Sequence, residues 1–238
     1  VTKLDKYTGE QIVALDVLGK TKGLLSHSYD VDKNTLLSMI KGTAVEGYKL
    51  VELENLKKAA DLLEPISREG KLKIIIDHCF DVKGVGTVIL GKVTQGKVRV
   101  YDNLKLVPKG ADVVVKSIQM HDDSVEEATS PARVGLALKG IVPDDVQRGD
   151  LLCMPDTVLV SNEIELDYIP NKFFKEKIAE NQTFLVNLGL QIKPAKITSL
   201  NPMRLSLGKP AAYEKGEICV ILKPESASIR IVGSGKIK

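Results

Sequence analysis

The sequence predicts a mainly β protein with two consecutive β-barrels preceded by a partial α/β segment. From Leu72 onward, short β-branched runs recur between glycines, as in Gly86–Gly96. Many short strands at such spacing are typical of closed barrels. Before Leu72, helix-like and strand-like stretches alternate instead. We therefore expect three domains, at residues 1–66, 70–156 and 158–238, with a polar connector between the first two and Pro155-Asp156 near the second boundary.

In the first domain, helical spacing of apolar residues is the main signal. Ile12 and Leu15 fall on one helical face, and Gly19 sits where helices often stop. Pro65 ends the last helical pattern. The expected elements, in order, are a helix over Gln11–Lys20, a short strand at Gly23–Leu25, an apolar cluster at Leu36–Ile40, and a helix over Glu54–Leu63 that buries one face made by Leu53, Leu56, Ala60 and Leu63.

The two barrels are predicted from β-rich runs separated by turn residues. Arg148-Gly149-Asp150 is interpreted as one such turn. The strands expected in the first barrel are Leu72–Ile76, Gly86–Leu90, Lys97–Val100, Asn103–Val107, Val113–Gln119, Arg133–Lys139 and Leu151–Cys153. Those expected in the second are Ser161–Tyr168, Thr183–Leu188, Lys193–Leu200, Arg204–Leu207, Ile218–Leu222 and Ser228–Ile231.

Composition narrows the functional classes. Hydrophobic residues make up 43% of the 238 residues but aromatic residues only 4%, so the cores must consist of Val, Ile and Leu. A net charge of +3 does not by itself indicate nucleic acid, so any RNA contact must be local. Three distant cysteines argue against a disulfide framework or a zinc site and for a reducing, cytoplasmic setting. No apolar run is long enough to span a membrane, and no catalytic or metal-binding motif occurs.

One segment imitates a phosphate-binding loop. Gly86–Val93 has the spacing of GxxxxGK[ST], but Val93 lacks the hydroxyl that would hold magnesium. Its interior is β-branched and apolar, and no amphipathic helix follows. We therefore interpret it as a barrel strand.

The run Asp77–Gly96, DHCFDVKGVGTVILGKVTQG, resembles the opening of the second domain of translation factors of the elongation factor Tu class. Its DHxF-x-[IV]-KG-x-GTV form is most similar to the selenocysteine-specific, SelB-like branch of archaeal type. The resemblance implies that the two barrels are domains 2 and 3 of such a factor, and that residues 1–66 are part of an incomplete GTPase-type domain.

The resemblance also implies a binding site for the aminoacylated end of tRNA. Asp77, His78 and Phe80 match the amino-acid end of that site. Ser117–His121, with Gln119 and His121, matches the place of the terminal adenosine, and Arg133 accompanies the Asp-His pair. Arg133 and a protonated His78 would favour an anion such as a selenolate, with Asp77 orienting the imidazole. Charge would then separate a selenolate from a seryl hydroxyl.

Each of these residues also has a structural interpretation. His78 and Asp77 can satisfy each other inside a barrel, and Phe80 can belong to the core. His121 can simply be exposed in a polar loop. Arg133 can pair with Glu126 or Glu127.

The guanine-binding motif of GTPases, [NT]KxD, has two competing placements. Thr2–Asp5 matches the letters, with Lys41–Ala44 as the later loop that closes over the base. We prefer a placement in which Gly23–Ser28 is the preceding strand and Tyr29–Asp32 is a degenerate motif. The degenerate nucleotide-binding candidates are Asp30, Asp32, Gly42 and Thr43. Neither placement supplies the phosphate-binding segments, so GTP and magnesium are expected only if a complete G domain lies upstream.

These patterns favour a carrier of a specialised aminoacyl-tRNA, selenocysteyl-tRNA or similar, to the ribosome, with no DNA or membrane partner. Two other hypotheses stay open. The chain can be the non-catalytic part of a GTPase whose phosphate-binding half lies elsewhere, or a degenerate paralogue that uses its barrels as a protein-docking module in translation.

Overall fold

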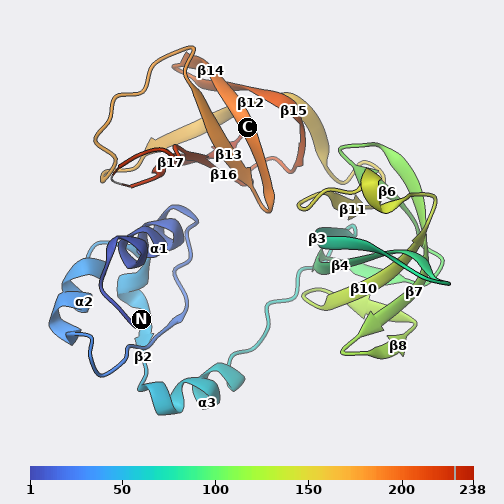
Figure 1. The fold of residues 1–238 in the computed structure, drawn as a ribbon, viewed down its shortest axis with the longest axis horizontal. Coiled ribbons are helices and arrows are strands. Elements are labelled where there is room, and N and C mark those ends of the chain that lie inside the picture. The colour runs from blue at the N-terminus through green and yellow to red at the C-terminus, as the bar shows by residue number, and fades with distance from the viewer. Residues whose placement is uncertain (228) are drawn as a thin grey trace.

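A computed structural model of the chain describes residues 1–227 and 229–238 (Figure 1). The N-terminal segment, residues 1–61, holds a short parallel pair of strands with a helix in the connection between them. Its elements are α1 (Lys6–Val17), β1 (Leu24–Leu25), α2 (Lys33–Ile40), a 3₁₀ turn (Ala44–Gly47), β2 (Lys49–Leu50), a second 3₁₀ turn (Leu53–Asn55) and α3 (Leu56–Asp61).

Two helix boundaries correct the sequence analysis. The helix expected over Gln11–Lys20 begins at Lys6, because the Asp5 carboxylate accepts hydrogen bonds from the backbone N–H groups of Tyr7 and Thr8. The helix expected over Glu54–Leu63 is a 3₁₀ turn followed by the shorter α3. None of its residues is buried, so the apolar face expected there does not pack against a core.

The first barrel follows an exposed connector that runs from α3 to β3 (Figure 1). Its sheet has the strand order β10-β4-β3-β11-β6-β7-β8, and an additional pairing of β10 with β7 closes six of these strands into a barrel. The strands are β3 (Lys73–Val82), β4 (Gly86–Gln95), β5 (Lys97–Arg99), β6 (Asn103–Val107), β7 (Ala111–Met120), β8 (Asp123–Val125), β9 (Glu127–Thr129), β10 (Arg133–Lys139) and β11 (Leu151–Cys153).

The second barrel is closed in the order β12-β15-β14-β13-β16-β17, so the mainly β fold with two barrels is confirmed. The strand expected at Ser228–Ile231 is wrong: β17 begins at Ile231, and Ser228 lies outside the described residues. The strands are β12 (Leu159–Pro170), β13 (Thr183–Leu188), β14 (Gln191–Leu200), β15 (Met203–Tyr213), β16 (Ile218–Leu222) and β17 (Ile231–Ile237).

The barrel cores are built mainly from branched aliphatic residues. The core of the first barrel contains Val, Ile, Leu and Ala and no aromatic side chain, and Ile74, Ile76 and Ile89 are fully buried in it. The core of the second barrel adds Phe184 and Tyr213. Alternation along the strands sends these side chains inward and leaves the intervening ones on the outer surface.

The three parts are joined by specific contacts. Helix α1 lies beside β16 and β17 of the second barrel (Figure 1), where Arg230 forms a bidentate ion pair with the nearly buried Glu10. The barrels contact each other through a small apolar cluster around Val107, Leu151 and Ala212. In the described residues, no helix has the length and apolar character that a membrane crossing requires.

Candidate functional site

Asp77 stands at an irregularity in the hairpin formed by β3 and β4. The register of β3 against β4 shifts between Ile76 and His78, so Asp77 has no direct partner on β4. Such bulges bend a strand and re-aim a side chain. The strand expected to end at Ile76 therefore continues through Asp77 to Val82, and the bulge brings the side chains of Asp77 and His78 together although they are adjacent in sequence.

The Asp77 carboxylate is the centre of a cluster of three basic side chains. Its Oδ1 accepts a hydrogen bond of 2.8 Å from Nε of Arg148. Its Oδ2 lies 3.3 Å from Nδ1 of His78 and 3.7 Å from Nη2 of Arg133. Asp77 is 24% exposed, whereas the three basic side chains are each more than half exposed. The cluster thus fixes the carboxylate while presenting the two guanidinium groups and the His78 ring to solvent.

The cluster acts on the ionisation of Asp77. The hydrogen bond from Arg148 is the main reason that the pKa of Asp77 lies below its usual range, and the charges of His78, Arg148 and Arg133 lower this pKa further. Arg133 is the most distant of the three groups and makes the smallest contribution. Its guanidinium therefore keeps the capacity to bind a second anion.

A continuous cross-strand row leads from this cluster over the outer face of the barrel. His78 is paired with Leu90, Leu90 with Gly135, and Gly135 with Gln119. Residues in such a row project on the same face of the sheet. A pocket of about 200 Å³ lies along this row, and it is lined by Leu90, Gly91, Gln119, His121, Asp122, Arg133, Val134 and Gly135.

Gly135 is the reason that the row contains a hollow. A Cβ atom at this position would lie 3.5 Å from Leu90 Cδ2 and 3.9 Å from Gln119 Cβ, so any side chain would fill the space between them. The neighbouring pair of this face sets Arg133 directly opposite Lys92. Like charges opposite each other on adjacent strands are unfavourable. The pocket therefore has an apolar floor, the amide of Gln119 and a basic edge at Arg133, where an anionic group can bind, while the carboxylate of Asp122 lies elsewhere in its lining.

His121 is positioned by a tight turn. Met120 pairs with Asp123, so β7 and β8 are joined by the two residues His121 and Asp122, whose φ angles are 51° and 71°. Positive φ at both positions is the geometry of a type I′ hairpin, and His and Asp enter this region more readily than most residues. The polar loop expected around His121 is thus a hairpin turn, and it places the imidazole at the rim of the pocket.

The structure agrees with two of the structural interpretations of the site residues, since His121 is exposed and Asp77 and His78 are paired, and it contradicts others. His78 is not buried, and Phe80 is 40% exposed on the outer part of β3 rather than in the core. Arg133 pairs with Asp77 and not with Glu127, which is bound by Lys97 and Arg99. Gln119, His121 and Arg133 share one pocket, Asp77 and His78 adjoin it through Arg133, and Phe80 does not line it.

Sequence reasoning missed two basic residues of this face, Arg148 and Lys92. Arg148 lies 71 residues from Asp77 in the chain and stands in a turn before β11. The Arg148-Gly149-Asp150 signature indicates a turn but not the direction of the arginine. In the sequence, Lys92 belongs to the run Gly86–Val93 that imitates a phosphate-binding loop, which indicates nothing about its cross-strand neighbour. Its pairing with Arg133 depends on the register of β4 and β10.

The nucleotide-binding candidates lie in local turns of the N-terminal segment. Asp30 is exposed in the turn after β1. Asp32 caps α2 by accepting a hydrogen bond from the backbone N–H of Thr35. The backbone N–H of Gly42 donates to Glu46, and the Thr43 hydroxyl donates to the carbonyl of Ile40. Gly86–Val93 lies within β4, as expected of a barrel strand.

Comparison with known families matches the part of the first barrel from β4 to β11 to one type of domain. Residues 86–153 match the family "Elongation factor Tu domain 2". The chain is 38% identical over 235 residues to the uncharacterised protein MJ0325 of Methanocaldococcus jannaschii, covering 96% of this chain and 75% of that protein. It is 34% identical over 200 residues to the selenocysteine-specific elongation factor of the same organism, covering 83% of this chain and 42% of that factor.

A solved structure has the same fold over nearly the whole chain. The apo form of translation elongation factor SelB from Methanococcus maripaludis superposes with a TM-score of 0.83 at 24% identity. The match covers 98% of this chain and 62% of that one. This likeness shows the fold, with both barrels and the N-terminal segment in equivalent order.

Proposed function

This chain belongs to the same family as MJ0325 and resembles elongation factor Tu and SelB, and we propose that it acts as a translation factor of this type. Specifically, we propose that it binds the aminoacylated end of a specialised tRNA. The cargo proposed is selenocysteyl-tRNA or a tRNA charged with a similarly anionic amino acid. The chain would deliver it to the ribosome in the cytoplasm, with RNA rather than DNA as its nucleic-acid partner.

The observation that carries this proposal is the Asp77 cluster at the edge of the pocket on β4, β7 and β10. Single-stranded RNA ends are bound by stacking on rings and by hydrogen bonds to splayed bases. The His121 ring and the Gln119 amide stand at the same pocket and provide both types of contact. The Leu90 and Gly135 pair leaves room for a flat group between them.

The amino-acid end of the cargo is assigned to the basic side of the pocket. Arg133 contacts Asp77 only at 3.7 Å, and Lys92 forms no ion pair or hydrogen bond with another described residue. A selenolate near these cations would gain a charge-assisted contact that a neutral seryl hydroxyl cannot make. Discrimination would then come from charge, because the two side chains differ little in size.

The test compares binding of selenocysteyl-tRNA and seryl-tRNA by the wild type and by Arg133→Ala. The wild type should prefer the selenocysteyl form. The variant should reduce this preference by roughly tenfold, because one hydrogen bond to a charged group is lost. Arg99→Ala is the matched control, since Arg99 is an exposed arginine of the same barrel that pairs with Glu127 away from the pocket.

The same binding measurements distinguish the tRNA-carrier hypothesis from the protein-docking hypothesis. Identical preference ratios in wild type and Arg133→Ala would reject the assignment of Arg133 to the amino-acid end. A wild type that binds no charged tRNA selectively, while still binding a translation partner, would favour the protein-docking module.

We also propose that the N-terminal segment does not hold GTP tightly by itself. Asp32, Gly42 and Thr43 are engaged in hydrogen bonds of their own turns, which supports this proposal. Calorimetric titration of the 238-residue chain with GTP and magnesium should show no strong binding. Micromolar affinity would contradict the proposal and would require a nucleotide site in this segment.

A further inference from the structure

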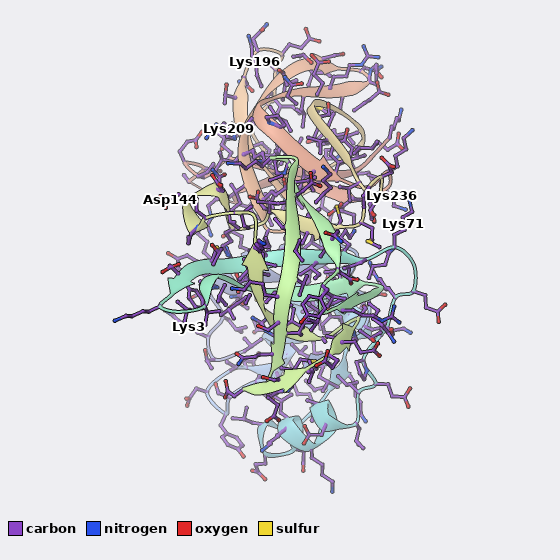
Figure 2. The ribbon with its side chains drawn as sticks, turned by 90° about the vertical axis from the view of Figure 1, so that its right-hand side faces the viewer. Lys3, Lys71, Asp144, Lys196, Lys209 and Lys236 are labelled. Atoms are coloured by element: carbon purple, nitrogen blue, oxygen red, sulfur yellow. The ribbon has the colours of Figure 1, made fainter. Side chains whose placement is uncertain are left out.

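A second polar pocket lies between the two barrels and shares no lining residue with the Asp77 cluster. It has a volume of about 330 Å³, which is near the lower end of the range for small-molecule sites. Figure 2 shows Lys209 and Asp144 on the same flank of the molecule, Lys209 on the second barrel and Asp144 on the first. The pocket is lined by Pro108, Lys109, Asp144, Asp145, Gln147, Asp150, Lys193, Lys209 and Pro210.

Lys193 is the unusual residue of this pocket. Along β14 the buried positions are Gln191, Lys193, Ala195 and Ile197, so Lys193 occupies the inward-facing row that carries core residues further along the strand. It is only 8% exposed. Gln191 in the same row exchanges hydrogen bonds with the backbone of Ala212, but Lys193 forms no ion pair or hydrogen bond with another described residue. Lys193 Nζ is not one of the fully buried polar atoms that lack a hydrogen bond, so its ammonium group keeps access to the pocket and can contact a ligand there.

The acidic counterpart of Lys193 is Asp150, which is 5% exposed. One of its oxygens accepts a hydrogen bond of 2.8 Å from the backbone N–H of Gln147. Lys193 and Asp150 attract each other electrostatically but are not in direct contact. Burial lowers the pKa of Lys193 and raises the pKa of Asp150, so each group lacks solvation that a bound group of opposite charge would restore.

The remaining charges of the pocket are balanced. Lys109 and Asp145 form an ion pair with each other. Lys209 and Asp144 form no ion pair or hydrogen bond with another described residue. Two ammonium groups and two carboxylates are therefore available to a ligand, between walls formed by Pro108 and Pro210.

We propose that this inter-barrel pocket binds a small zwitterion of the α-amino-acid class, with its carboxylate at Lys193 and Lys209 and its ammonium group at Asp150 and Asp144. A simple anion would have to approach two carboxylates, and a simple cation would have to approach two ammonium groups. A zwitterion satisfies both sets at once. This site is separate from the proposed tRNA-end site, so it does not depend on that function.

The test is a titration of the full 238-residue chain with L-alanine. Binding is monitored by the NMR chemical shifts of the backbone amides of residues 147–150 and 191–193. Three further probes are titrated for comparison. Acetate carries only the carboxylate of the zwitterion, methylammonium carries only its ammonium group, and inorganic phosphate is a simple anion. Alanine should produce saturable shifts at these amides. Each of the other three probes should bind at least roughly tenfold more weakly, because each satisfies only one set of charges.

Three variants make the test specific. Lys193→Met keeps the length of the buried side chain and removes its charge. Asp150→Asn keeps an oxygen that can accept the hydrogen bond from Gln147. Each should weaken alanine binding by roughly tenfold or more. Lys196→Met is the matched control on the same strand, where the lysine is exposed and does not line the pocket (Figure 2), and it should bind alanine as the wild type does.

Several results would overturn the proposal. One is phosphate or acetate binding as tightly as alanine, which would indicate a simple anion site. Another is alanine binding that survives Lys193→Met in a variant whose spectrum shows an intact fold. The absence of saturable shifts with every probe would mean that Lys193 is only a buried structural lysine.

Discussion

At the scale of single residues, Asp77 is the hub on which the proposed tRNA-end site depends. Sequence analysis placed Asp77, His78 and Arg133 in one site, and the structure brings their side chains together. It could not supply Arg148, whose contact with Asp77 depends on how β3 and the turn before β11 meet. Nor could it supply the bulge at Asp77, which results from a register shift and has no sequence signature here.

The hub makes a prediction about the ionisation of Asp77. Arg148→Ala should raise the pKa of Asp77 toward the ordinary value, because the hydrogen bond from Arg148 is its largest cause of lowering. Arg133→Ala should raise it less, since Arg133 acts only through its charge at 3.7 Å. Titration of the carboxyl carbon by NMR measures both changes. Equal shifts in the two variants would contradict this ranking.

The lowered pKa of Asp77 also predicts how the stability of the fold changes with pH. The pKa of Asp77 is lower in the folded chain than in the unfolded chain, so its pairing stabilises the fold above the unfolded pKa of about 3.9. That stabilisation is lost as the pH falls through the lowered, folded pKa. The stability difference between wild type and Arg148→Ala should therefore be present at neutral pH and shrink on acidification. A difference that is constant across this range would show that Arg148 acts by another route.

At the scale of elements, the turn Arg148-Gly149-Asp150 connects three environments. Arg148 binds Asp77, and Asp150 faces the inter-barrel pocket. Between them Gly149 has a φ of 92°, and a Cβ atom there would lie 2.5 Å from the backbone N of Gln191 and the carbonyl carbon of Leu190. The turn therefore packs directly against the backbone of the second barrel at Leu190 and Gln191.

Because of this close approach, Gly149→Ala should destabilise the fold more than a glycine-to-alanine change at a positive-φ position with open space around it. We expect a loss of about 2 to 3 kcal/mol in the free energy of unfolding, from positive-φ strain and a clash with backbone that cannot move aside. Gly110→Ala is the matched control, because Gly110 has a φ of 81° and open space around it. It should lose only about 1 kcal/mol. Equal losses in denaturant unfolding would mean that the barrels are not in tight contact at Gly149.

Most elements could be predicted because they follow strong local patterns. Asn103–Val107, Arg133–Lys139, Leu151–Cys153, Thr183–Leu188 and Ile218–Leu222 have the predicted bounds. The three-residue strands β8 and β9 were missed, since their acidic residues resemble a loop and only pairing with β7 and β5 defines them. The apolar spacing of Leu53 and Leu63 predicted a packed helix face, but no neighbouring element buries it. The domain boundaries and the nucleotide-motif placement stay predictions.

At the scale of the whole molecule, α1 packs against the second barrel, although the chain continues from the N-terminal segment into the first barrel. Val13 of α1 packs with Val220 and Ile231, and Glu10 forms its bidentate ion pair with Arg230. Arg230 also donates its backbone N–H to Glu10. The Glu10 pKa is lowered chiefly by the hydrogen bonds from the Arg230 side chain.

This arrangement predicts that Glu10→Ala loosens α1. Removing the nearly buried Glu10 carboxylate breaks its charge-assisted hydrogen bonds with Arg230 and should cost about 2 kcal/mol, since the half-exposed guanidinium can be rehydrated. Hydrogen exchange of the α1 amides should accelerate, while exchange in the first barrel stays unchanged. Glu64→Ala, at an exposed position of the connector, is the control. Wild-type exchange rates of α1 in Glu10→Ala would show that the apolar contacts alone hold the helix.

The central claim is that the first barrel binds the aminoacylated end of a tRNA. The most direct measurement is the affinity of the full chain for the same tRNA with and without its esterified amino acid, at two salt concentrations. Contacts with phosphates alone are strongly salt-dependent and would not distinguish the two forms. We predict that the charged form binds more tightly at both salt concentrations, and that Arg133→Ala reduces this preference. Equal affinity for charged and uncharged tRNA at both concentrations would contradict the claim.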